Sequence, residues 1–264
     1  MISNKDKLRF EKLDEIAYEL FKEGKSFSYI SKTLKVKRQS LTRRLKEKYN
    51  ITYELNGKKP VNSSFFSTPT DKNMYWLGFI FADGNVSSKG NYLEIATKDK
   101  EHLEKFKSDI SSQHKIAEKI VNTNSYWRIA ICDSQIYNDL LNWGVVPKKS
   151  FIDINYPKIA REHELSFLRG FIDGDGSFRI RKQSENHYPI IEITVGFHNI
   201  SFANQLKEIL KSYGIEFKLY KGKTSYRLMS TRKDETISFI NMLYKNSTIH
   251  LDRKYKKIKS YCRF

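Results

Sequence analysis

The chain has 264 residues, of which 39% are hydrophobic and 14% aromatic, and this composition excludes an intrinsically disordered tail. No apolar run approaches the roughly 20 residues that a membrane-spanning helix needs. Lysine and arginine total 48 against 30 aspartate and glutamate, which gives a net charge of +18. This surplus predicts a polyanionic partner, and we favour nucleic acid over the alternatives, a membrane surface or an acidic protein, because no basic amphipathic helix stands out.

The cysteine pattern and the N-terminus bear on the compartment. Cys132 and Cys262 form no spaced set with histidines, which argues against a disulfide scaffold and against a zinc site. The N-terminus shows no signal-peptide core. We therefore expect a cytoplasmic, nucleoid-associated protein of a bacterium or of a phage-infected host cell, with no membrane partner.

Residues 1–50 are predicted to form a small all-α domain of three helices. The first helix covers residues 7–23 and ends at Gly24, Ser26 can cap the second helix, and the third runs to about Tyr49. Three short helices of this spacing are typical of a helix-turn-helix, whose third helix enters the major groove of DNA. Between Gly24 and Lys46 there are eight Lys or Arg and no acidic residue. A generic three-helix bundle with a solvated basic face remains the alternative.

The third helix and the residue before it carry the side chains that we expect to contact DNA, which are Lys37, Arg38, Gln39, Ser40, Arg43 and Arg44. One residue departs from the common pattern, because Lys35 stands in the turn at a place where glycine is frequent.

Residues 51–72 contain turn-forming residues without periodicity and are predicted to be a linker. The aromatic pair Phe65 and Phe66 could pin part of this segment to a neighbouring element or lie near DNA.

From about residue 73 the sequence repeats itself, with a period of roughly a hundred residues. Each half opens with a helix that ends in Asp-Gly, at residues 76–84 and 168–176. Strands, a helix, a second strand pair and a closing helix follow in both halves. We predict an α+β fold of two pseudo-symmetric αββαββα repeats, over residues 73–150 and 151–264, with a basic C-terminal tail and two antiparallel sheets side by side.

Each motif helix carries two small residues that stand four positions apart, Gly78 with Ala82 and Gly170 with Gly174. Residues at this spacing share one helix face, and small side chains there let two helix backbones approach closely. If the two helices pair about a local two-fold axis, Asp83 and Asp175 arrive at neighbouring C-terminal ends. The glycine after each Asp is expected to leave the helix in a left-handed conformation.

A helix C-terminus is electronegative, so two carboxylates placed there repel each other and the helix dipole. A divalent cation resolves this conflict, and carboxylate and carbonyl oxygens are the ligands that Mg²⁺ prefers. Acid pairs that hold such ions recur in phosphodiester cleavage. The alternative is that Asp83 and Asp175 are structural capping acids.

Residues 78–84 and 168–176 resemble the two motifs of a single-chain LAGLIDADG homing endonuclease, and the resemblance covers about residues 73–264. The second motif is a close match. The first departs at its sixth position, where Phe81 replaces the usual acid, but the family's catalytic acid is the eighth position, Asp83. The resemblance implies a saddle of two sheets and a monomeric enzyme of intron homing that makes a metal-dependent double-strand break at a long DNA site.

The resemblance also implies a metal-binding pocket. Asp83 and Asp175 would each serve the chemistry on one DNA strand, and the backbone carbonyls of Ala82 and Gly174 would be further ligands. The implied cofactor is Mg²⁺, as two or three ions, with Mn²⁺ also accepted.

Four basic residues are expected to border this pocket. Lys149 and Lys254 match the positions of the family's pocket lysines, where an amine could neutralise the reacting phosphate or orient water. Lys98 and His198 end equivalent strands and could also line the pocket. The alternative is that these residues are ordinary phosphate-contacting or solvated side chains.

Alternation along the strands places polar side chains on one face of each predicted sheet, where they can lie in the major groove. The side chains expected to contact DNA are Glu94, Arg128, Arg179, Arg181, Glu192, Thr194 and Arg227. An ordinary solvated sheet face is the alternative for any one of them.

Two other functions share this scaffold. Some bacterial transcription regulators join a helix-turn-helix to a LAGLIDADG-like domain that has lost its catalytic acids, and intron maturases use the scaffold to bind intron RNA. Both acids are present here, which favours the nuclease over a regulator that binds without cutting. Maturase activity stays open beside cleavage, and an intron or free-standing gene is favoured over an intein because no splicing-domain motifs flank the chain.

Overall fold

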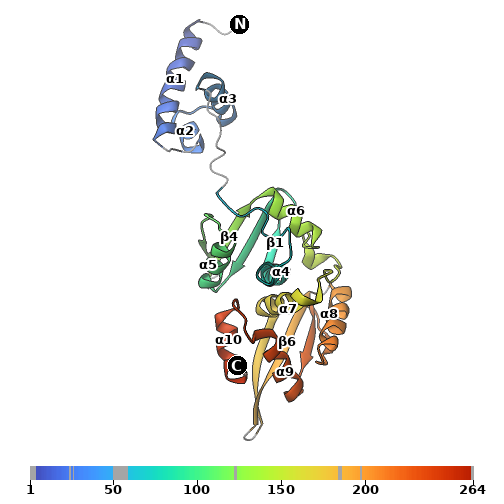
Figure 1. The fold of residues 1–264 in the computed structure, drawn as a ribbon. Coiled ribbons are helices and arrows are strands. Elements are labelled where there is room, and N and C mark those ends of the chain that lie inside the picture. The colour runs from blue at the N-terminus through green and yellow to red at the C-terminus, as the bar shows by residue number, and fades with distance from the viewer. Residues whose placement is uncertain are drawn as a thin grey trace. The chain divides into compact units, whose positions relative to one another are not determined.

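A computed structural model describes all of the chain except residues 1–3, 24, 26, 50–58, 122–123, 184–185, 197 and 263–264. The chain divides into two compact units, Met1–Lys58 and Lys59–Phe264 (Figure 1). In the described part of the chain, no helix combines the length and apolar character that crossing a membrane requires.

The first unit contains the three helices expected from the sequence, α1 (Asn4–Lys22), α2 (Phe27–Thr33) and α3 (Arg38–Tyr49). Their small core is made of Ala17, Phe27, Ile30, Leu41 and Leu45. The expected helix stop at Gly24 and cap at Ser26 lie outside the described residues.

The turn between α2 and α3 is left-handed at Lys35, which has a φ of 50°. The backbone N–H of Val36 closes the end of α2 by donating to the carbonyl of Ser31 at 3.0 Å. The position therefore has the conformation that explains why glycine is common in this turn, and here a lysine adopts it.

The second unit consists of two repeats with the same order of elements, as predicted (Figure 1). The first repeat contains α4 (Asp71–Asp83), β1 (Gly84–Val86), β2 (Tyr92–Thr97), α5 (Lys100–Asp109), β3 (Ala117–Val121), β4 (Asn124–Cys132) and α6 (Ser134–Asn142). The second repeat contains α7 (Arg161–Asp175), β5 (Gly176–Gln183), β6 (Asn186–Gly196), α8 (Ile200–Ser212), β7 (Lys218–Lys221), β8 (Ser225–Ser230) and α9 (Lys233–Tyr244). Short helices complete the unit, namely η1 (Lys149–Phe151), α10 (Asp252–Ile258) and η2 (Lys259–Tyr261).

Each repeat forms a four-stranded antiparallel sheet, in the strand orders β1-β2-β4-β3 and β5-β6-β8-β7. The predicted alternation is present in β2, where Leu93 and Ile95 are buried while Ala96 is exposed. One continuous hydrophobic core joins both repeats, with α4 and α7 side by side at its centre (Figure 1).

Residues 59–70, in the second half of the expected linker, pack against the first repeat. Phe65 and Phe66 are buried, and the indole N–H of Trp143 donates to the Phe66 carbonyl at 2.9 Å. The hydroxyl of Ser67 donates to Asp139 at 2.7 Å. The buried aromatic pair and these two hydrogen bonds together hold this segment against α6 and its neighbours.

Close packing of α4 against α7 depends on the small residues that the sequence singled out. A Cβ atom added to Gly78 would lie 2.0 Å from the carbonyl oxygen of Phe167, and one added to Gly170 would lie 1.9 Å from that of Tyr75. A Cβ on Gly174 would lie 2.3 Å from the Cβ of Ala82. The predicted pairing of the two motif helices is therefore confirmed.

The predicted left-handed glycine caps are wrong. Gly84 has φ −81° and ψ 153°, and Gly176 has φ −85° and ψ 161°, so both are extended and lead directly into a strand. Glycine is needed there for room, because a Cβ on Gly84 would lie 2.6 Å from the Cγ2 of Ile80 and one on Gly176 would lie 2.5 Å from the carbonyl oxygen of Ile172.

Candidate functional site

The paired helices bring the carboxyl groups of Asp83 and Asp175 to one place. Asp83 is the last residue of α4 and Asp175 is the last residue of α7. The Asp83 side chain is exposed and Asp175 is half-buried. Asp83 Oδ2 lies 3.6 Å from the position that a Cβ on Gly174, the residue before Asp175, would occupy.

The two carboxylates repel each other electrostatically. Burial raises the pKa of Asp175 to about 7, and the charge of Asp83 adds to the rise. Although Asp83 stays in contact with solvent, partial desolvation by the surrounding protein also raises its pKa, while Lys254 and Lys149 oppose the shift. The lysines therefore compensate the paired negative charges only in part. A cation placed between the two carboxylates would be held strongly.

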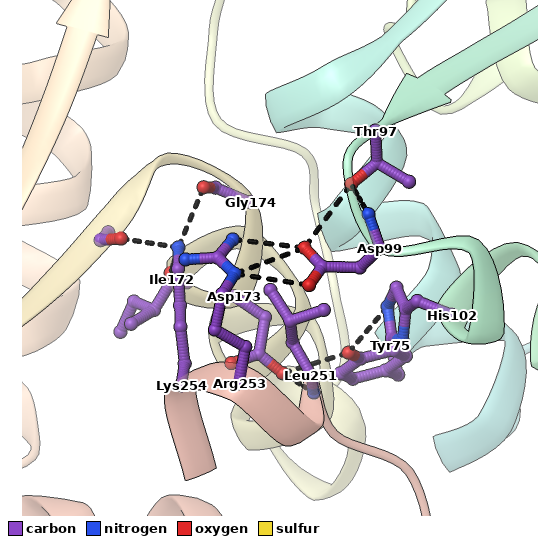
Figure 2. Close-up of polar contacts among 11 residues, drawn as sticks. Tyr75, Thr97, Asp99, His102, Ile172, Asp173, Gly174, Leu251, Arg253 and Lys254 are labelled. Atoms are coloured by element: carbon purple, nitrogen blue, oxygen red, sulfur yellow. Dashed lines mark hydrogen bonds and ion pairs between the residues drawn. The ribbon is translucent and has the colours of Figure 1, made fainter. Parts of the chain in front are cut away.

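The side chains of the two predicted pocket lysines reach the C-terminal ends of the motif helices. The buried amine of Lys254 donates to the carbonyls of Ile172 at 3.0 Å and Gly174 at 2.8 Å (Figure 2). It also donates to the carbonyl of Gly176. Burial lowers the pKa of this amine to about 8.

Lys149 makes the equivalent contact on the other motif helix. Its amine donates to the Ala82 carbonyl at 3.1 Å, and burial lowers its pKa. A lysine therefore reaches the negative C-terminal end of each motif helix, where a cation is stabilising.

The groups at this site fit a hard divalent cation. Two carboxylates and the carbonyls of Ala82 and Gly174 supply oxygen ligands of the kind Mg²⁺ takes. Each of these carbonyls accepts a bond from a lysine, and a carbonyl has two lone pairs, so one remains for a cation. Among the described residues, no group of three or more His, Cys, Asp or Glu side chains could hold a metal ion. A cation here would therefore complete its coordination with carbonyls, water or phosphate.

Lys98 and His198 lie just beyond the ends of β2 and β6, and both are exposed. The Lys98 amine lies 5.4 Å from the ring centroid of Tyr126, and the His198 ring lies 6.4 Å from that of Phe151. Their part in the pocket stays a prediction.

Several of the sheet residues expected to contact DNA pair with one another. Arg128 donates to Glu94 at 2.9 Å, and Arg179 forms an ion pair with Glu192. Exposed ion pairs of this kind are weak, so bases or phosphates can replace either partner.

Thr194 and Arg227 lie opposite each other on β6 and β8 and are both exposed. The side chain of Arg181 lies outside the described residues.

In the first unit, Lys37, Arg38, Gln39 and Arg43 are exposed, in keeping with the expected contacts to DNA. Arg44 and Ser40 instead form an internal network. The Nε of Arg44 donates to both carboxylate oxygens of the buried Asp14 at 3.0 and 3.1 Å, and its NH1 donates to Ser40 at 2.9 Å. This network fixes α3 to α1, a role that the local basic pattern gave no means of foreseeing.

Asp173 was not among the predicted site residues, and it connects both repeats beneath the site. Its buried carboxylate accepts hydrogen bonds from the Tyr75 hydroxyl at 2.8 Å and the Leu251 N–H at 2.8 Å (Figure 2). It also accepts one from the Tyr244 hydroxyl at 2.7 Å. Leu251 begins the segment that carries Lys254. The signal in the sequence that could have indicated Asp173 was the family's usual acid at the sixth motif position, which is present in the second motif.

Replacing Asp173 by alanine is expected to lower the free energy of unfolding by about 3 to 5 kcal/mol, because it leaves several buried donors unpaired. Chemical denaturation followed by circular dichroism measures this loss. Phe81, at the equivalent position of α4, packs on Phe167 at a centroid distance of 5.4 Å and provides the control. Phe81→Leu should cost less than about 1.5 kcal/mol. An equal loss in both variants would contradict the role given to Asp173.

Sequence profiles of known families match both repeats. The profile of the WhiA LAGLIDADG-like domain matches residues 72–164, and that of a LAGLIDADG-like domain matches residues 162–243. Among curated proteins, none matches the chain. The fold and the paired motif helices agree with these profiles, and the chain is a two-motif protein of the LAGLIDADG family.

Several solved structures are similar to this chain. Meganuclease I-SmaMI bound to uncleavable DNA is 16% identical and has a TM-score of 0.52, over 73% of this chain and 90% of that chain. Homing endonuclease I-WcaI bound to its DNA recognition sequence is 13% identical with a TM-score of 0.53, over 74% and 90%. Full-length DUF199/WhiA from Thermatoga maritima is 15% identical with a TM-score of 0.47, over 75% and 70%.

Proposed function

We propose that the protein is a metal-dependent, site-specific endonuclease that cuts both strands of DNA. The observation that carries this proposal is the meeting of Asp83 and Asp175 at the paired helix ends, where burial and mutual repulsion raise the pKa of Asp175 to about 7. A pair of acids that serves only to cap helices gains nothing from such repulsion, whereas a cation site uses it.

The residues of the pocket have separate tasks in this proposal. Asp83 and Asp175, with the carbonyls of Ala82 and Gly174, would hold Mg²⁺ or Mn²⁺. The bound ion supplies Lewis-acid chemistry that activates water and stabilises the leaving oxygen. Lys149 and Lys254 place positive charge where the reacting phosphate gains negative charge. One chain supplies both acids, so a monomer can cut both strands.

Features outside the pocket also favour double-stranded DNA as the partner. The net charge of +18 favours a polyphosphate, and the exposed basic residues of α3 suit a major groove. Two of the structurally similar proteins, I-SmaMI and I-WcaI, are bound to DNA. The first unit would then extend the length of DNA that the second unit contacts.

A DNA-binding protein that does not cut is the second candidate. The match of residues 72–164 to the WhiA LAGLIDADG-like domain favours this candidate. Selection of bound sequences from randomised double-stranded DNA, followed by addition of Mg²⁺, separates the two. The nuclease is expected to linearise a plasmid that carries a selected sequence, whereas a binder would leave every selected sequence intact.

Binding of Mg²⁺ is expected to depend on pH through Asp175. In the metal-free protein, the raised pKa keeps Asp175 protonated up to about pH 7, while the unfolded chain ionises near pH 4. The contribution of this group to stability is therefore present at low pH and is lost as the pH rises to 7. Mg²⁺ should raise the melting temperature more at pH 8 than at pH 5.5, because the ion needs the ionised carboxylate.

Thermal denaturation with and without Mg²⁺ measures this difference. Asp175→Asn should abolish the pH-dependent gain, and the control Asp234→Asn, at an exposed position of α9, should keep it. An equal Mg²⁺ effect at both pH values in the unmodified protein would speak against Asp175 as a ligand.

A further inference from the structure

Each segment that carries a pocket lysine is held by a residue of the opposite repeat. In the first repeat, Asp99 stands directly before α5. Its carboxylate accepts from Arg253 Nε at 3.1 and 3.2 Å and from Arg253 NH2 at 3.0 Å (Figure 2). Lys105, on α5, forms an ion pair of 2.7 Å with Asp252. Lys254 directly follows Arg253 in the chain, so its backbone is fixed from the first repeat.

The second repeat holds the Lys149 segment in the same way. Asn199 stands directly before α8 and is buried. Its amide nitrogen donates to the Lys149 carbonyl at 3.1 Å, and its amide oxygen accepts from the Ile154 N–H at 3.3 Å. The Ser201 N–H, in the first turn of α8, donates to Asp153 at 3.1 Å.

Asp99 and Asn199 are equivalent positions of the two repeats. Each is the N-cap residue of the helix that follows the second strand, and neither side chain makes a capping hydrogen bond to its own helix. Asp and Asn are among the best N-cap residues, and a helix loses stability when the cap bond is absent. Both side chains instead contact a lysine segment of the other repeat, which indicates a role outside their own helices.

We propose that Asp99 and Asn199 are positioning residues, each of which holds the lysine segment of the opposite repeat in place for the cutting of one DNA strand. This inference rests on the proposed nuclease function. The amine of Lys254 reaches the end of α7, whereas that of Lys149 reaches the end of α4, so the two anchors act on different halves of the site.

The contacts made by Asp99 and Asn199 favour a role in the precise placement of the lysine segments over a role in fold stability. The fork between Arg253 and Asp99 fixes both distance and angle, as planar guanidinium–carboxylate pairs do. Arg253 is 54% exposed, and exposed ion pairs contribute little to folding. A shift of about 1 Å in a catalytic group can reduce the rate about a hundredfold, so a weak contact can still have a large effect on cutting.

Hydrogen exchange in the full-length protein tests the anchoring without any need for cutting. Asp99→Ala should speed amide exchange in residues 251–258 about tenfold and leave residues 149–154 unchanged, and Asn199→Ala should do the reverse. Asn199→Asp keeps the acceptor but loses the donor to Lys149, and it serves if the alanine variant does not fold. The control Glu216→Ala removes an exposed ion pair with Arg232 and should change neither segment. Equal change in both segments, or in neither, would overturn the anchoring.

Cutting measured separately on each DNA strand tests the proposed effect of the two positioning residues on catalysis. With a plasmid that carries one selected site, Asp99→Ala and Asn199→Ala should each slow one strand about tenfold, within the range seen when supporting residues around a site are lost. Nicked plasmid should accumulate, with opposite strands cut in the two variants. Equal slowing of both strands, or nicking of the same strand by both variants, would refute the positioning role. If the unmodified protein cuts no DNA, the nuclease function fails, and hydrogen exchange alone decides on the anchoring.

Discussion

Replacing either Asp83 or Asp175 by asparagine is expected to reduce double-strand cutting at least about a thousandfold, because each change removes several kcal/mol of metal-ion stabilisation from the transition state. DNA affinity should stay the same or rise slightly, since the change removes one negative charge from the surface that we propose to face the DNA phosphates. Single-turnover cutting of a plasmid with one selected site measures the first effect, and a gel-shift titration measures the second.

The two variants also test whether the acids form one site. Because the charge of Asp83 raises the pKa of Asp175, the two carboxyl groups interact, and the loss of either one should lower the affinity of the other for Mg²⁺. The exposed control Asp234→Asn should cut at the rate of the unmodified protein. Cutting retained by both Asp83→Asn and Asp175→Asn would remove the basis of the metal assignment.

Adding a methyl group at Gly78 or Gly170 is expected to cause a large loss of stability. The new Cβ would lie 2.0 Å from the Phe167 carbonyl oxygen in the first case and 1.9 Å from that of Tyr75 in the second. Because both obstacles are backbone atoms, α4 and α7 would have to move apart. We expect each alanine variant to lose at least about 3 kcal/mol of unfolding free energy.

Urea denaturation of the full-length chain measures this loss. Gly90→Ala is the matched control, because the nearest atom to its added Cβ is a side-chain carbon of Tyr92 at 3.7 Å. It should change stability by less than about 0.5 kcal/mol. A Gly78→Ala variant that unfolds at the same urea concentration as the control would contradict the close approach of the helices.

The sequence predicted the architecture of the second unit because its signals are local and repeated. Small residues four apart determine which helix faces meet, and alternation along β2 determines which side chains are buried. The two acids follow from the same pattern, since each stands at the end of a helix whose contact face is already known. Duplication made the prediction stronger, because both halves show the same order of elements.

The contacts that depend on chain segments far apart could not be predicted in this way. Asp99 reads as a helix cap, because Asp is common there, and nothing near it in the sequence indicates Arg253. Asp173 looked like one more motif acid until the fold brought Tyr75 and Tyr244 to it. Arg44 belonged to a basic helix, and its bond to Asp14 appears only once α1 packs on α3.

The conformation of the two glycines that follow the motif acids also could not be predicted from the sequence. The residue after each motif acid was expected to be left-handed, a common reason for glycine at a helix end. Gly84 and Gly176 are instead extended, and crowding by Ile80 and Ile172 explains the absence of a side chain. A sequence shows that a side chain is missing, whereas the structure shows which neighbour requires the space.

Mapping both cut positions on a selected DNA site, at single-nucleotide resolution and with Mg²⁺ added or withheld, tests the central claim most directly. Two acids at neighbouring helix ends predict one cut in each strand, close together and dependent on the metal. DNA that is bound specifically but stays whole with Mg²⁺ and with Mn²⁺ would contradict a nuclease and leave a DNA-binding protein in its place.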